Sequence, residues 1–158
     1  MENDVSEQMI EFNKIYKMID DTYHNYAKSC DLSNASLWIL YSVWENNETY
    51  TQKELCEVWS YSRQTINSAL KNLEGQGLIQ LLHELDNKKN KQIILTKRGK
   101  GLAEKVIVPL MEAEKNSFAS LSNEERCIFL KLMKKHAELF GKEVKKIIDK
   151  SSEDISSQ

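Results

Sequence analysis

Apolar residues recur every three or four positions along the first part of the chain. Between residues 5 and 28 they are Val5, Met9, Phe12, Tyr16, Ile19, Tyr23 and Ala27. This spacing places them on one face of an α-helix, so an amphipathic helix is predicted over about residues 5–28. A turn is predicted at residues 31–34, with Ser33 as N-cap of a second helix. The apolar positions of that second helix are Leu37, Leu40, Tyr41 and Trp44.

A short third helix is predicted to begin after Thr51. Thr51 and Glu54 have the spacing of a capping box, in which the hydroxyl and the carboxylate each accept a hydrogen bond from an otherwise unpaired backbone N–H group. Leu55 and Val58 supply the apolar positions of this helix. The polar segment 60–62 then interrupts it.

A fourth helix is predicted from residue 63 to about residue 74, with Ser62 as its N-cap. Gly75 and Gly77 favour its termination because glycine tolerates the left-handed backbone conformation found at helix C-termini. Its inward-facing apolar positions are Ile66, Leu70 and Leu73.

Two apolar runs around a polar turn predict a β-hairpin at about residues 78–95. The turn, residues 86–90, is longer than two residues, so it leaves the strand register open. Thr96 is predicted to cap a helix that runs to about Phe118, in which Pro109 predicts a kink or a local break.

Another capping-box pattern, Ser122 with Glu125, predicts the start of the last helix. Its apolar positions are Ile128, Leu132, Ala137, Phe140, Val144 and Ile148. The tail, residues 151–158, lacks an apolar period and is expected to be frayed and flexible.

Composition agrees with a mainly α-helical protein. The 158 residues include only five glycines and one proline, and such a chain has the length of one domain, which we expect over residues 1–150. No apolar stretch has the length of a membrane span, and the acidic N-terminus argues against a signal peptide. Three widely spaced cysteines argue against a disulfide framework and fit a reducing cytoplasm. They are Cys30, Cys56 and Cys127.

The net charge of −2 conceals a local basic segment. Residues 86–100 carry six basic side chains against one acidic side chain, Asp86. Charge alone favours an ordinary solvated surface. The neighbouring elements change this interpretation, because a helix, a tight turn, a helix and a hairpin in succession form a winged helix-turn-helix.

In such a fold the second helix keeps its apolar side on the domain and places its polar side in the major groove of double-stranded DNA. Arginine pairs with guanine and glutamine or asparagine with adenine, whereas serine, threonine and lysine hold phosphates. The candidate DNA-binding residues on the helix are Ser62, Arg63, Gln64, Thr65, Asn67, Ser68 and Lys71. Those at the tip of the hairpin are Lys88, Lys89 and Lys91.

The segments 51–79, 86–100 and 121–126 together resemble the multiple-antibiotic-resistance regulator (MarR) family. In the second segment, Leu95-Thr96-Lys97-Arg98-Gly99 is similar to the family's Leu-Thr-x-x-Gly helix start. The resemblance covers roughly residues 5–148. Lys88 stands where the family's wing commonly has arginine, and lysine lacks the planar fork that suits deep minor-groove reading.

The resemblance implies a cytoplasmic, homodimeric transcriptional regulator, most simply a repressor that binds an inverted-repeat operator. It also implies a helix-turn-helix at about 51–75, a wing at about 78–95 and dimerisation helices at about 5–28 and 97–148. A small aromatic effector that releases the DNA is a further hypothesis, and it rests on the aromatic residues described next. An alternative is a helical protein-interaction module of the same fold that has lost DNA binding.

An aromatic cluster has two interpretations. Aromatic side chains at helical spacing usually fill a core, but aromatic walls also suit a flat apolar ligand. The candidate ligand-binding residues are Tyr23, Trp38, Tyr41 and Trp44. Cys30 is more simply a buried inert thiol than a redox sensor.

No enzyme, metal or cofactor is predicted. The three histidines lack metal-ligand spacing, and no nucleophile–base or phosphate-loop motif occurs. An enzyme of unknown type is the last alternative. The histidines are His24, His83 and His136.

Overall fold

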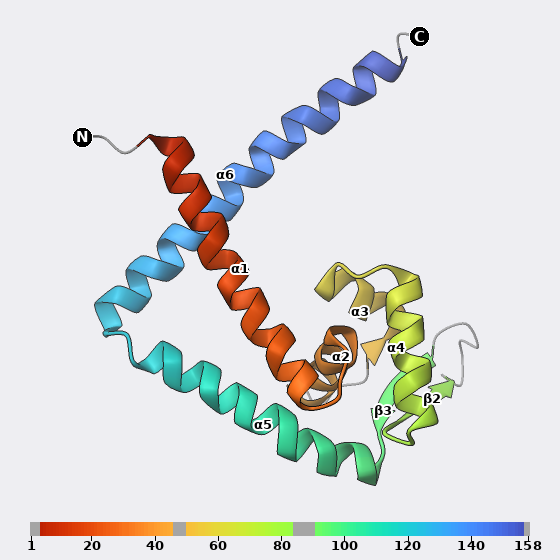
Figure 1. The fold of residues 1–158 in the computed structure, drawn as a ribbon. Helices are drawn as coiled ribbons and strands as arrows, with labels where there is room; N and C mark the ends of the chain where they lie inside the picture. The colour runs from red at the N-terminus through yellow and green to blue at the C-terminus, as the bar shows by residue number, and fades with distance from the viewer. Residues whose placement is uncertain (1–3, 46–49, 84–90, 157–158) are drawn as a thin grey trace. The chain divides into compact units, whose positions relative to one another are not determined.

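The computed structural model describes residues 4–45, 50–83 and 91–156 (Figure 1). The chain falls into two compact units, 1–111 and 112–158. The helices are α1 (Val5–Ser29), α2 (Asn34–Glu45), α3 (Gln52–Trp59), α4 (Arg63–Gly75), α5 (Lys97–Ala119) and α6 (Asn123–Ser156). The strands are β1 (Tyr50–Thr51), β2 (Ile79–His83) and β3 (Lys91–Leu95). A mainly α-helical fold with a small β-wing is therefore confirmed.

The first unit contains a three-stranded antiparallel sheet in the order β1-β3-β2. The wing hairpin, β2 with β3, pairs Ile79 with Leu95 and Leu81 with Ile93. Tyr50 of β1 pairs with Ile93 on the other edge of β3. The sequence does not predict β1, because a strand of two residues is too short to show a strand period.

The core of the first unit lies where α2, α3, α4, α5 and the sheet meet. The inward positions predicted for α4 are confirmed, since Ile66, Leu70 and Leu73 are all buried. The prediction for Val58 is wrong: this side chain is 55% exposed, whereas Leu55 is fully buried. On α3 the inward position after Leu55 falls instead on Trp59, one residue later, which packs against the core.

Side-chain caps begin the helices as the sequence predicted. Ser33 Oγ accepts a hydrogen bond from the Ser36 N–H at 3.1 Å, and Ser62 Oγ accepts from the Thr65 N–H at 3.1 Å. The capping boxes Thr51–Glu54 and Ser122–Glu125 are both formed. Thr96 Oγ1 accepts from the Gly99 N–H at 3.0 Å. These caps fix where the loops between helices end.

The second unit consists of the end of α5 and the whole of α6. Helix α5 continues through Pro109, so the local break that the sequence allows is not observed. Helix α6 extends to Ser156, beyond the end expected near residue 148. No glycine or proline follows Gly141 to interrupt it. In the described chain no residue of α6 is buried.

None of the helices in the described ranges combines the length and the apolar character needed to cross a membrane.

Candidate nucleic-acid interface

The start of α4 is fixed by its neighbours in the first unit. The turn between α3 and α4 contains Ser60 in the left-handed conformation, with φ of 53°. The Gln52 side chain, at the start of α3, donates a hydrogen bond from Nε2 to the Arg63 carbonyl oxygen at 3.1 Å. At the other end of α3, Trp59 Nε1 donates to Ser42 Oγ of α2 at 2.7 Å. These hydrogen bonds fix the start of α4 relative to α3, and α3 relative to α2.

The polar side of α4 is open to solvent, as the sequence analysis expects. The exposed candidates on this side are Ser62, Arg63, Gln64, Thr65, Asn67, Ser68 and Lys71. With about 100° between successive residues, Gln64, Ser68 and Lys71 lie opposite the buried side of the helix. Glu74, at the far end, is the one acidic residue of α4.

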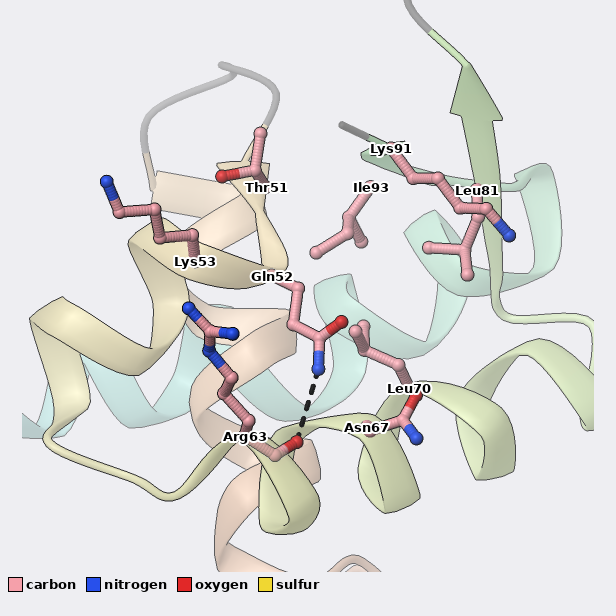
Figure 2. Close-up of a pocket in the computed structure, with 9 residues that line it drawn as sticks. All are labelled: Thr51, Gln52, Lys53, Arg63, Asn67, Leu70, Leu81, Lys91 and Ile93. Carbon is pink, nitrogen blue, oxygen red and sulfur yellow. Dashed lines mark hydrogen bonds between the residues drawn. The ribbon is translucent and has the colours of Figure 1, made fainter. Parts of the chain in front are cut away.

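A hollow of about 570 Å³ lies between the start of α3, the first turns of α4 and the wing (Figure 2). We call it the wing groove. Its lining residues are Thr51, Gln52, Lys53, Arg63, Asn67, Leu70, Leu81, Lys91 and Ile93. Three of them are cationic, and none of the described residues that line it is acidic. The groove is therefore suited to an anion.

Gln52 and Lys53 belong to this surface but were missed by reasoning from the sequence. They follow the capping residue Thr51, where the sequence predicts only the start of a helix. A signal was available in principle, because the side chains at the start of the first helix of a helix-turn-helix adjoin the second helix. The structure shows this directly in the hydrogen bond from Gln52 to the Arg63 carbonyl.

A second hollow lies on the other flank of α4, and its lining includes Thr65, Ser68 and Tyr61. Burial raises the pKa of Tyr61, and the negative charge of Asp20 adds to this effect. The phenol therefore stays a neutral hydrogen-bond donor. The same hollow contains both Lys28 and Asp31, so its charge is mixed, unlike that of the wing groove.

Of the wing, the structure describes the two strands. Lys91, at the start of β3, is exposed and lines the wing groove. Lys88 and Lys89 lie outside the described residues, so their part in the candidate interface stays a prediction.

The aromatic candidates pack against one another. Trp38 lies between Tyr23, with ring centroids 4.8 Å apart, and Trp59, at 4.2 Å and nearly parallel. Tyr41 meets Trp38 edge-on at 5.5 Å, and Trp44 packs against the core. These contacts are what a core-filling cluster requires. A ligand-binding role for the four residues stays a prediction.

Cys30 is half-buried, with its sulfur 3.8 Å from the Ser29 hydroxyl oxygen. The neighbouring Tyr26 hydroxyl donates to the Val106 carbonyl oxygen at 2.7 Å. Burial is the main cause that raises the pKa of Tyr26, and Cys30 adds to it. The hydrogen bond from Tyr26 to Val106 connects α1 to α5 beside this thiol.

A helix, a tight turn, an exposed polar helix and a hairpin wing define the chain as a winged helix-turn-helix protein. Residues 31–88 match the model of the MarR family. An uncharacterised helix-turn-helix-type transcriptional regulator of Bacillus subtilis, YybA, is 32% identical over 104 residues. That match covers 66% of this chain and 65% of the relative. The chain is therefore similar to MarR family regulators over its helix-turn-helix and the start of its wing.

Solved structures have the same fold. A MarR family regulator from Neisseria meningitidis is 23% identical, with a TM-score of 0.74 over 88% of this chain and 97% of that one. A MarR family regulator from Listeria monocytogenes, solved with a 26-mer DNA, is 23% identical, with a TM-score of 0.68 over 85% of this chain and 89% of that one.

Proposed function

We propose that this protein is a sequence-specific DNA-binding transcriptional regulator that binds double-stranded DNA through α4 and the wing. The observation that carries this proposal is the exposed polar side of α4 beside a groove whose described lining has three cationic residues and no acidic one. A helix with an apolar inner side and a polar outer side fits a major groove, and phosphates attract the adjoining cations. The DNA complex of the Listeria family member supports the same partner. We propose no enzymatic activity.

The regulator acts as a homodimer. Helix α6 carries large apolar side chains that nothing in the described chain buries, including Leu132 at 57% and Phe140 at 61% exposure. Apolar faces of this extent are unusual on a monomer. A second copy of the chain supplies the same apolar face, and a two-fold dimer presents two α4 helices to an inverted-repeat operator.

The regulator is a repressor, and a small aromatic effector releases it from the operator. The proposed binding walls are Tyr23, Trp38, Tyr41 and Trp44. Because the first three rings already contact one another, a flat effector must enter between them and change the environment of Trp38. The effector shifts DNA affinity only by its different affinities for the free and DNA-bound states, and a coupling of 1–3 kcal/mol corresponds to about 5–150-fold.

The DNA-binding proposal is tested by selecting bound fragments from genomic DNA and measuring their affinity at several salt concentrations. We expect enrichment of an inverted repeat and an affinity that falls steeply with salt. If no duplex binds above the level of an unrelated protein of equal charge, the chain is instead an interaction module of the same fold.

The effector proposal is tested by titrating salicylate while following tryptophan fluorescence and operator affinity. We expect quenching together with weaker DNA binding. Quenching with unchanged operator affinity would contradict release, and no response at millimolar salicylate would contradict an aromatic-acid effector.

A further inference from the structure

The structure divides the polar residues of α4 between two tasks. We propose that the wing groove holds one strand of the DNA backbone, with Arg63, Lys53 and Lys91 contacting its phosphates. Base reading is then left to the outermost residues of α4, Gln64, Ser68 and Lys71. This inference rests on the proposed DNA-binding function and assigns Arg63 a role different from the base contact expected from its residue type.

The position of Arg63 on α4 supports a phosphate contact. It is the first residue of α4, and its carbonyl oxygen accepts the hydrogen bond from Gln52. Figure 2 shows its side chain extending from the start of α4 toward α3, alongside Gln52. It therefore lies on the flank of α4 that lines the wing groove, on the side nearer α3. Gln64, one residue later, points away from the buried side.

The charge of the wing groove also favours phosphate. Lys53 comes from α3, Arg63 from α4 and Lys91 from β3, so three elements each contribute a cationic residue to the lining of one hollow. The ion pair of Lys53 with Glu57 is 3.7 Å long, and its side chains are 73% and 64% exposed. Such exposed pairs contribute little, so a phosphate can replace the carboxylate of Glu57.

The geometry of a DNA duplex places one backbone strand next to the wing groove. A helix in the major groove lies between two backbone strands, and a wing beside it reaches across one of them. That strand must pass between α4 and the wing, where the wing groove lies. The hollow on the other flank contains Asp31 as well as Lys28, so it attracts a phosphate less strongly than the groove does.

The test compares Arg63→Ala, Lys53→Gln and Gln64→Ala on two duplexes: the tightest genomic fragment and an unrelated sequence of equal length. We expect the first two variants to weaken both duplexes by the same factor and to reduce the salt slope by about 0.9 each. Their ratio of specific to non-specific affinity stays that of the wild type. We expect Gln64→Ala to lower this ratio by about 5–150-fold with an unchanged salt slope.

Lys105→Gln is the matched control, because Lys105 is an exposed lysine of α5 outside the groove. It makes the same change in net charge as Lys53→Gln, and we expect it to leave affinity and salt slope unchanged. Thermal unfolding checks that every variant is folded. A lower specificity ratio for Arg63→Ala with an unchanged salt slope would overturn the inference alone. If the wild-type protein binds neither duplex, the proposed function fails with it.

Discussion

Gly99 occupies a backbone position that has no room for a side chain. It lies in the first turn of α5, directly against the start of β2, and an added Cβ atom would overlap the Leu78 carbonyl oxygen. Thr96 reinforces this contact, since its hydroxyl donates to the Gly77 carbonyl oxygen at 2.7 Å and its N–H donates to the Leu78 carbonyl oxygen at 3.0 Å. Gly99 and Thr96 therefore join the end of α4, the wing and α5.

We expect Gly99→Ala to lower the free energy of unfolding by about 1–3 kcal/mol, because backbone must move to admit the methyl group. Gly101→Ala is the matched control in the same helix, since a Cβ atom there meets nothing within 4 Å. Alanine favours helix by about 0.5–1 kcal/mol over glycine, so the control should be neutral or stabilising. Urea unfolding of both variants measures the difference, and equal stabilities would contradict the close approach.

Helix caps could be predicted from the sequence, whereas contacts between residues far apart in the sequence could not. Thr96 and Ser62 could be identified as caps because a cap depends on a few neighbouring residues. The bond from Thr96 to Gly77 joins residues that are 19 apart in sequence. Likewise the exposed side of α4 follows from its apolar period, whereas the groove that Arg63 lines depends on where α3 and β3 lie. No local pattern contains that information.

At the scale of elements, periodicity predicted the six helices, because each has an apolar side and a capped start. It failed where an element is very short or where a helix lacks a stop signal. Strand β1 exists because Tyr50 and Thr51 find the free edge of β3, and that edge is a product of the hairpin. Helix α6 continues past the predicted end to Ser156, and no glycine or proline follows Gly141 to stop it.

The wing lysines are expected to contact DNA phosphates. We expect replacement of Lys88, Lys89 and Lys91 together by glutamine to weaken all duplexes alike, because phosphate contacts carry no sequence information. The salt slope should become shallower by up to about 0.9 for each lost contact. Binding measured from low to physiological salt tests this, and an unchanged slope would place these lysines away from the phosphates.

At the scale of the whole molecule, the second unit lacks a core of its own. Helix α6 pairs Phe129 with Phe118 of α5, with ring centroids 6.0 Å apart, but none of its described residues is buried. Helices in proteins gain most of their stability from tertiary packing. The sequence showed the apolar stripe, yet the stripe has the same appearance whether its own domain or a second copy covers it. Coverage of this stripe by a second copy therefore stays a proposal.

The final prediction concerns assembly and the operator. We expect Phe140→Glu to shift the protein from dimer to monomer at micromolar concentration, because a charge would be placed in the apolar face that the second copy covers. Ser151→Glu, also on the exposed surface of α6, adds the same charge and should remain dimeric.

In the wild-type dimer the two α4 helices should lie about 34 Å apart, so operator half-sites should be centred about ten base pairs apart. Inserting five base pairs between the half-sites should abolish tight binding, since it rotates one half-site to the opposite face of the duplex. Light scattering of both variants and titration of the spaced operators measure these outcomes. A monomeric wild-type protein, or equal affinity for both spacings, would contradict the two-fold arrangement.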